Sequence, residues 1–231
     1  MALAQSKLSL AEYLDWENQQ PERHELFRGE VVAMVGVRRV HGMVAGNVFA
    51  SLKQQLKGTP CHVFTESLKV QVADDTIFYP DVFVTCDAAD LKTDYLFKSP
   101  TLVVEVLSDS TQAYDRGLKF ARYRRLESLQ EYLLIHPDSR LVELFRRGAD
   151  GRFTLFDHTA TPRFPLPSIG CELALEDIFE GLEGGCVICG VDAVRCAHRH
   201  PTVRGWFCRM LVSNANRIRN VLMPLSARRR A

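Results

Sequence analysis

The chain has 231 residues and a mass of 26.2 kDa, with 46% hydrophobic and 25% charged residues, a composition typical of globular proteins. It excludes a collagen, a mucin and a disordered acidic chain, and its length suits one well-buried core better than two full domains. The formal net charge of +1 hides two unlike segments: residues 1–181 carry 20 Lys and Arg against 26 Asp and Glu, and residues 182–231 carry 9 against 2.

This charge difference predicts a domain boundary near residue 181. Residues 1–181 show regular hydrophobic patterning, whereas residues 182–231 begin with a Gly184-Gly185 linker and keep no sustained period. All cations of this second segment are Arg. The basic tail, residues 182–231, therefore either has an acidic or nucleic-acid partner of its own or lies outside the folded unit. We expect it to be poorly structured.

The basic tail also holds enough thiolate and imidazole for a zinc knuckle. The pair Cys186-x-x-Cys189 is a reasonable half-site. The remaining candidates are Cys196, His198, His200 and Cys208. Their spacing matches no common zinc finger, so we favour a tail without bound Zn²⁺ over a zinc-dependent nucleic-acid arm.

No targeting or membrane segment is visible in the sequence. The N-terminus lacks an apolar run of signal-peptide length, and stretches such as 102–107 are far shorter than the ~18 residues of a spanning helix. The cysteines, an odd number, are therefore expected to be thiols in a reducing cytoplasm. Of these, Cys61, Cys86 and Cys171 should pack as small apolar groups.

The predicted elements follow from capping residues and from the spacing of apolar side chains. Ser9 and Glu12 have the spacing of a capping box, which marks a helix start. Apolar side chains that recur at about every fourth residue predict further helices, and apolar runs bounded by turn residues predict strands. The predicted elements are helix 9–18, strands 24–27 and 31–35, helix 41–58, strands 68–72, 78–85 and 102–107, helix 111–126, strands 131–136, 141–146 and 153–156, an irregular segment 162–167 and a short helix 173–179. This order indicates an α/β (α+β) domain with a central mixed β-sheet flanked by helices.

Two acids interrupt predicted buried strands. Asp81 lies in Tyr-Pro-Asp-Val-Phe-Val, and Glu105 lies in Val-Val-Glu-Val-Leu-Ser. A buried carboxylate is costly unless it is paired or binds a metal, and two of them on adjacent strands would form an oxygen-lined pocket suited to Mg²⁺ or Mn²⁺. The alternative is structural, because one acid could pair with an Arg and either could lie at an exposed strand end.

A cation that could complete this site is Lys119. It lies early in the helix that follows the Glu105 strand, and a right-handed crossover would bring that helix near the strand ends. A Lys there could hold a nucleophilic water while a metal withdraws charge from a phosphate. Taken alone, Lys119 is better explained as a surface i,i+4 partner of Asp115.

Several short motifs occur together in a characteristic order, although each is common by itself. They are Glu25-Leu26-Phe27-Arg28-Gly29-Glu30, His41, Pro80-Asp81, Glu105-Val106-Leu107-Ser108 and Tyr114-Asp115-Arg116-Gly117-x-Lys119. Because it carries this ordered set of motifs, the chain resembles the Uma-two family of bacterial proteins. The resemblance extends from about residue 5 to about residue 180. That family is assigned to restriction endonucleases of the PD-(D/E)XK nuclease superfamily. The resemblance implies a restriction endonuclease-like fold with a metal site at one edge of its sheet.

The resemblance also implies roles for single residues. Asp81 and Glu105 match the metal-binding acids of the superfamily, and Glu25 matches the upstream acid that often completes the site. The superfamily usually has a Lys two residues after the second acid, where this chain has Leu107. Lys119 would then be a migrated replacement that projects from the neighbouring helix.

The function implied is that of a Mg²⁺- or Mn²⁺-dependent endonuclease that hydrolyses phosphodiester bonds in DNA, with a homodimer as a plausible way to cut both strands. His41, at a helix N-terminus, and Arg122 are weaker candidates for nucleic-acid contacts. Either could instead be an ordinary cap or surface residue. Because Leu107 stands at the usual lysine position, an inactive protein of this fold that binds partners or nucleic acid is the alternative.

Overall fold

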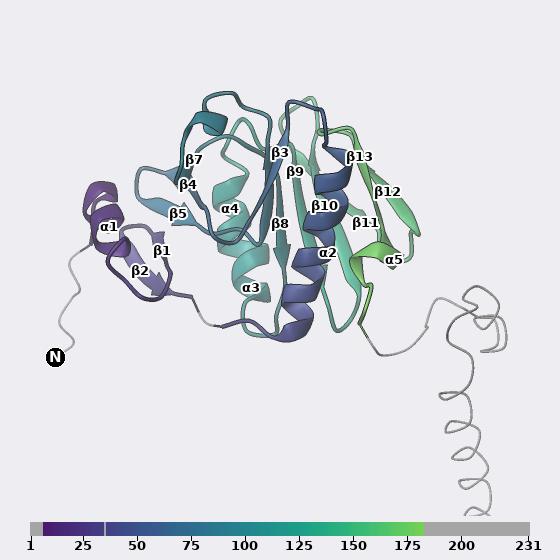
Figure 1. Cartoon of the computed structure of the whole chain (residues 1–231), viewed down its shortest axis with the longest axis horizontal. Helices are drawn as coiled ribbons and strands as arrows, with labels where there is room; N and C mark the ends of the chain where they lie inside the picture. Colours follow the sequence, from purple (N-terminus) through teal and green to yellow (C-terminus); the bar gives the residue numbers. More distant parts are fainter. Residues whose placement is uncertain (1–6, 35, 183–231) are drawn as a thin grey trace, which may run out of the picture. The chain divides into compact units, whose positions relative to one another are not determined.

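The centre of the protein is a six-stranded mixed β-sheet, in the part of the chain that the computed structural model describes, residues 7–34 and 36–182 (Figure 1). Its strand order is β11-β10-β9-β8-β6-β3. The central neighbours β8 and β9 run parallel, and the other neighbours run antiparallel. The strands are β3 (His62–Thr65), β6 (Val82–Thr85), β8 (Pro100–Val106), β9 (Glu131–His136), β10 (Leu141–Arg147) and β11 (Phe153–Asp157).

A five-stranded sheet, with the order β2-β1-β5-β4-β7, and a two-stranded hairpin accompany the central sheet. Their strands are β1 (His24–Phe27), β2 (Glu30–Ala33), β4 (Lys69–Ala73), β5 (Thr76–Phe78), β7 (Leu96–Phe97), β12 (Arg163–Leu166) and β13 (Cys171–Ala174). The helical segments are α1 (Leu10–Glu17), α2 (Arg39–Gln55), the 3₁₀ turn η1 (Asp90–Lys92), α3 (Gln112–Tyr114), the π-helical turn η2 (Asp115–Lys119), α4 (Phe120–Tyr123) and α5 (Leu175–Ile178). The predicted capping box of Ser9 and Glu12 starts α1.

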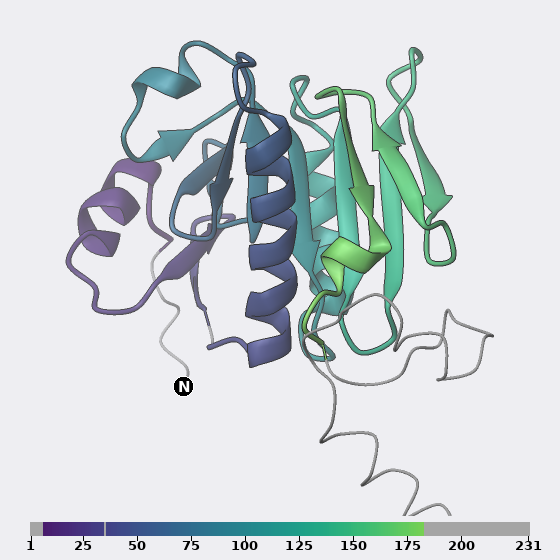
Figure 2. The same cartoon turned by 45° about the vertical axis from the view of Figure 1, so that its right-hand side comes forward.

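Both faces of the six-stranded sheet are covered. On one face lie α2, α5 and the β12–β13 hairpin (Figure 2), and on the other lie residues of β4, β5 and α4. Because successive side chains of a strand point to opposite faces, β8 divides its residues between two cores. Val104 and Val106 pack on the α2 side, whereas Val103 and Leu107 pack on the α4 side. Glu105 shares the orientation of Val103 and Leu107, so it faces the helical segment that carries Lys119.

The predicted fold class, a mixed α+β arrangement of sheet and flanking helices, is confirmed. The predicted single strand over 78–85 is wrong, because β5 ends at Phe78 and β6 begins at Val82 in a different sheet. Pro80 lacks the N–H that a continuous ladder would need, and the chain crosses between the sheets there. Asp81 therefore stands immediately before β6 rather than inside a strand.

The predicted helix over 111–126 is present but shorter, from Gln112 to Tyr123, and a π-helical turn interrupts it. The segment is α3, then the π-helical turn η2, then α4, which ends at Tyr123. Near the end of the domain, the segment 162–167 is strand β12 rather than irregular, and the predicted helix 173–179 is the end of β13 followed by α5. Strands β3 and β7 were not predicted.

Cys61 and Cys86 form a disulfide, which corrects the prediction that both are thiols. The reason is the antiparallel register of β3 and β6, where His62 lies opposite Thr85. Cys61 and Cys86 are the next residues out on each strand, so they face each other with a Cα–Cα distance of 4.0 Å. Cys171 is free and buried, as predicted.

The predicted boundary at residue 181 stays a prediction, because the basic tail and its candidate zinc residues lie outside the described residues. Among residues 7–34 and 36–182, none of the helices has the length and apolarity that crossing a bilayer requires.

Candidate active site

A cavity of about 460 Å³ opens beside the end of β8, between the start of α2, the β1–β2 hairpin and η2. It is lined by residues from well-separated parts of the sequence. Its charged lining residues are Glu25, Arg38, His41, Asp81, Glu105, Asp109, Asp115 and Lys119. All four predicted catalytic residues therefore face one space, and the weaker candidate His41 faces it as well.

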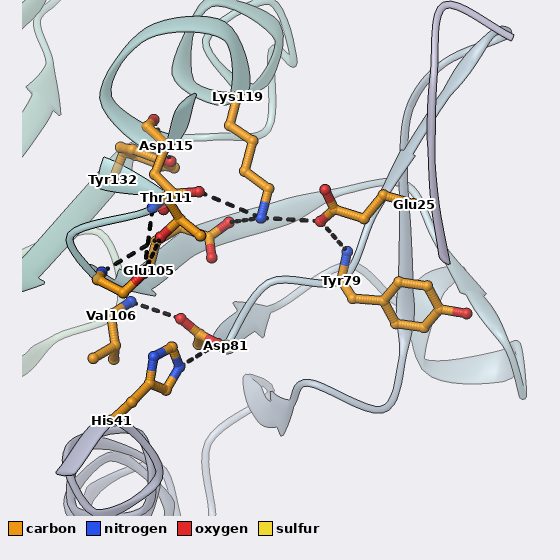
Figure 3. A network of polar contacts seen from close by, with 11 residues as sticks. Glu25, His41, Tyr79, Asp81, Glu105, Val106, Thr111, Asp115, Lys119 and Tyr132 are labelled. Atoms are coloured by element: carbon orange, nitrogen blue, oxygen red, sulfur yellow. Dashed lines mark hydrogen bonds and ion pairs between the residues drawn. The ribbon is translucent and has the colours of Figure 1, made fainter. Parts of the chain in front are cut away.

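The ammonium of Lys119 lies at the centre of a cluster of carboxylates (Figure 3). Its Nζ is 2.9 Å from Oε1 of Glu25, 3.3 Å from Oε1 of Glu105 and 3.6 Å from Oδ1 of Asp115. Lys119 therefore reaches Glu105 from a different element of the fold, as its predicted role requires.

The π-helical turn η2 directs both of its end residues inward. Asp115 and Lys119 are buried, whereas Leu118 between them is 49% exposed. The backbone carbonyl of Asp115 accepts a hydrogen bond of 3.0 Å from the hydroxyl of Tyr132 on β9, which fixes the turn against the sheet. The surface-pair interpretation of Asp115 and Lys119 is thus wrong, because the pair exists but lies inside the protein. Turns of this type occur frequently at functional sites.

Leu107 stands where the sequence resemblance leads us to expect a lysine, and it belongs to the apolar core. It lies two residues beyond Glu105 on the same face of the chain, where it is fully enclosed in the apolar core with Phe120 and Tyr132. The rings of Phe78 and Tyr114 lie 5.6 and 5.9 Å from the Lys119 Nζ. Apolar and aromatic groups therefore flank the polar cluster on its core side, and the cavity lies on the other side.

Asp81 is held from two sides. Its Oδ2 accepts a hydrogen bond of 2.6 Å from the backbone N–H of Val106, and its Oδ1 accepts one of 2.9 Å from Nε2 of His41. Its side chain is 13% exposed. The residue is thus at a strand end, as the structural alternative allowed, but it is mostly enclosed and carries no Arg partner among the described residues.

Glu25 is supported by a polar chain that begins on α1. Its Oε1 accepts a hydrogen bond of 3.3 Å from the backbone N–H of Tyr79, in addition to its contact with Lys119. The hydroxyl of Tyr79 donates to the buried carboxylate of Glu17 at 2.9 Å, and that carboxylate also accepts from the backbone N–H of His24. The α1 helix therefore fixes the strand segment from which Glu25 projects.

Burial and mutual charge shift the pKa values of the cluster. Burial raises the pKa of Glu25 and of Asp115, and it raises the pKa of Glu105 well above its ordinary value. Burial alone would lower the pKa of Lys119, but Glu105, Glu25 and Asp115 outweigh it and hold that pKa well above the usual value. Lys119 is therefore a charged ammonium at neutral pH.

The donor chemistry of this cavity fits a hard divalent cation. Carboxylate oxygens are the preferred ligands of Mg²⁺, and Oε1 of Glu105 is buried without a hydrogen bond of good geometry, although Lys119 is near. Four carboxylates face a single buried ammonium, so the cluster carries excess negative charge that a cation would relieve. Among the described residues, however, no three His, Cys, Asp or Glu side chains are gathered closely enough to hold a metal ion by themselves.

The structure does not bring every candidate residue into the cavity. The guanidinium of Arg122 lies 5.5 Å from the ring centre of Phe27, and Arg122 is absent from the cavity lining. Sequence reasoning missed the burial of Asp115 and the contact between His41 and Asp81. The motif Tyr114-Asp115-Arg116-Gly117-x-Lys119 contains Asp115 and was the available signal for the first of these.

The fold is a mixed α+β arrangement that a solved structure shares. It is similar to the crystal structure of a "putative nuclease belonging to DUF820" from Anabaena variabilis, with a TM-score of 0.60 and 20% sequence identity over 74% of this chain and 97% of that chain. The chain belongs to the Uma2 family, described as "Putative restriction endonuclease", whose model matches residues 10–177.

Two curated relatives from Synechocystis sp. support this membership. The uncharacterized protein slr1290 is 40% identical over 177 residues, which are 76% of this chain and 93% of that protein. The uncharacterized protein sll1609 is 31% identical over 159 residues, which are 67% of this chain and 90% of that protein.

Proposed function

We propose that this protein is a divalent-metal-dependent endonuclease that hydrolyses phosphodiester bonds in DNA. The observation that carries the proposal is the contact of the buried Lys119 ammonium with Glu105 and Glu25 in the cavity that Asp81 also lines. Charged residues that are buried together in a cavity, with pKa values shifted by burial and by one another, are typical of functional sites. Membership of the Uma2 family supports the same reaction class.

Asp81 and Glu105 are the proposed ligands of Mg²⁺ or Mn²⁺, with Glu25 as the third acid that the resemblance implies. Two carboxylates suffice when water and substrate phosphate complete the coordination, as is usual for Mg²⁺. When bound, such an ion makes water a better nucleophile and withdraws charge from the phosphate. Because Glu25 is already 2.9 Å from Lys119, its main contribution in this arrangement is to hold that ammonium in place.

Lys119 supplies fixed positive charge where negative charge develops during hydrolysis. Its three carboxylate neighbours keep it protonated and restrict its position, so little reorganisation is needed during the reaction. It can orient a water molecule or stabilise the phosphorane oxygens. Arg122, with its guanidinium on the Phe27 ring, is a proposed phosphate contact outside the cavity. A cytoplasmic homodimer remains part of the proposal.

One observation favours the alternative, an inactive protein of the same fold. Lys119 already neutralises part of the charge of Glu25 and Glu105, and the described residues hold no ready cluster of three metal ligands. A scaffold that had lost its metal could be stabilised in this way by the lysine alone.

Plasmid nicking with a matched pair of variants separates the two functions. Supercoiled DNA is incubated with the protein and Mg²⁺, Mn²⁺ or EDTA, and the comparison is made between Asp81→Ala and Asp109→Ala. Asp109 also lines the cavity, but its side chain is 89% exposed. We expect Asp81→Ala to lose metal-dependent nicking and Asp109→Ala to keep it. Equal nicking by both variants, or no nicking by the wild type under any condition, would favour the alternative.

A further inference from the structure

His41 and Asp81 form a pair that the predicted roles of either residue do not explain. His41 lies in the first turn of α2, and Asp81 precedes β6, so the two residues come from separate elements. Their contact, 2.9 Å between Nε2 and Oδ1, is well enclosed, with side-chain exposures of 12% and 13%. A carboxylate oxygen can only accept, so Nε2 of His41 must donate the hydrogen.

The carboxylate of Asp81 depends on this bond for its orientation. Asp81 lies between β5 and β6, where Pro80 interrupts the pattern of strand hydrogen bonds. The pairing of β6 with β8 begins only at Val82, which lies opposite Val104. The N–H of Val106 holds one carboxylate oxygen. With that bond alone, the carboxylate could still turn about it, whereas the bond from His41 to the other oxygen fixes its plane.

Both bonds leave coordination capacity on Asp81. An ionised carboxylate offers about four lone-pair sites, and the two hydrogen bonds use one on each oxygen. The remaining sites are free to accept a cation from the cavity. Hydrogen bonds that orient a ligating carboxylate in this way contribute to metal affinity without touching the metal.

Other roles for His41 fit the contacts less well. The His41 side chain is only 12% exposed, which does not fit a polar cap on an exposed turn. The N-cap residue of α2 is Arg38, and its side chain makes no capping hydrogen bond. A phosphate contact through Nε2 would require that nitrogen to leave Asp81. The predicted nucleic-acid contact therefore conflicts with the best-defined bond that His41 makes.

We propose that His41 is a positioning residue, which orients the Asp81 carboxylate for divalent-cation binding. This inference rests on the proposed function, because it assumes that Asp81 is a metal ligand. It deepens that function by assigning the α2 N-terminus to the support of the metal site rather than to the binding of DNA phosphate.

The test is Mn²⁺ binding to the full-length protein, measured by calorimetry or by electron paramagnetic resonance of free Mn²⁺. Three substitutions are compared: His41→Gln, His41→Asn and His41→Ala. The glutamine amide can place a donor near the position of Nε2, whereas the asparagine amide is one methylene shorter and the alanine has no donor. We expect His41→Ala and His41→Asn to weaken Mn²⁺ binding by about 10- to 100-fold, and His41→Gln to bind nearly as the wild type does.

A second comparison guards against a purely structural effect of these substitutions. In a protein that already carries Asp81→Ala, which has no side-chain oxygen for His41 to orient, a positioning role predicts that His41→Ala changes the remaining Mn²⁺ binding no further, since coupled residues are not additive. Thermal unfolding of each variant checks that it is folded, and should one truncation not fold, the Gln and Asn pair still decides the question.

The outcomes separate the inference from the function on which it rests. Wild-type protein that binds no Mn²⁺ would overturn both. Wild-type binding together with undiminished binding by His41→Ala and His41→Asn would overturn the inference alone. Equal weakening by all three substitutions, or additive weakening in the Asp81→Ala protein, would likewise contradict the hydrogen-bond role.

Discussion

Nζ of Lys119 lies 3.3 Å from Oε1 of Glu105, although Lys119 projects from a π-helical turn and Glu105 from the central strand β8. The position two residues after Glu105, where the sequence resemblance leads us to expect a lysine, is occupied by the buried Leu107. The Lys119 ammonium thus comes from η2, whereas Glu105 comes from β8. This arrangement makes the function of the site depend on the packing of η2 against the sheet.

Replacing Glu105 by Gln should separate stability from activity. Burial raises the pKa of Glu105, so ionising this carboxyl group costs more in the folded protein than in the unfolded chain, and a neutral amide of the same shape removes that cost. Lys119 keeps Glu25 and Asp115 as partners. We expect a melting temperature equal to or above that of the wild type, with loss of metal-dependent nicking, as measured by calorimetry and a plasmid assay. A strongly lowered melting temperature would contradict this account of the site.

Replacing Lys119 by Met should destabilise the protein, and more so at alkaline pH. Three buried carboxylates lose their common cation, and such losses typically cost about 3 to 5 kcal/mol. The folded-state pKa values of Glu25, Glu105 and Asp115 are already raised, and removal of Lys119 raises them further. Acids with a raised folded pKa favour folding at low pH and lose that contribution as pH rises through the folded pKa.

Urea unfolding at about pH 5 and about pH 8 measures this pH dependence. The loss of unfolding free energy caused by Lys119→Met should be smaller at the lower pH. Lys57→Met, at an exposed position, serves as the control and should show little effect at either pH. A loss that is equal at both pH values would argue against ionised carboxylates around Lys119.

The Cys61–Cys86 disulfide should stabilise the oxidised protein. It closes a loop with a sequence separation of 25, and a cross-link of this size contributes about 3 kcal/mol through the unfolded state. We expect reductant or the Cys61→Ser substitution to lower the melting temperature. Cys171→Ser should leave this sensitivity to reductant intact, since Cys171 is a free thiol. If reductant has no effect on the wild type, the two cysteines are not joined in solution.

Removal of the basic tail tests the predicted domain boundary. A chain that ends at residue 182 keeps every element described here, including both residues of each site contact. It should therefore fold with an unchanged melting temperature and retain nicking, and metal analysis of the full-length protein should find no zinc. Equimolar zinc, lost together with the tail, would instead support a zinc-dependent arm.

Much of the fold follows from local sequence patterns. The capping box of Ser9 and Glu12 defines the start of α1, and the period of Val44, Val48 and Leu52 defines the buried face of α2. The continuous apolar run along β8 also makes Glu105 recognisable as an acid in an apolar strand. These features depend on neighbours within one or two turns, so the sequence suffices to predict them.

Other features depend on pairing between distant segments. The contact of Cys61 with Cys86 follows from the register of β3 and β6, and β3 was not predicted at all. The burial of Asp115 depends on a π-helical turn fixed by Tyr132 of β9. The bond from His41 to Asp81 requires α2 and the β5–β6 crossing to meet. None of these relationships leaves a periodic trace in the sequence.

We propose that Lys119, which projects from η2, serves a metal-dependent hydrolytic site. The most direct test of this role is the rate at which supercoiled plasmid is nicked in Mn²⁺ by the wild type, Lys119→Ala and the surface control Lys57→Ala. We expect the wild type and Lys57→Ala to nick at similar rates, and Lys119→Ala to be slower by about 100-fold or more. Equal nicking by the wild type and Lys119→Ala would rule out this role of Lys119.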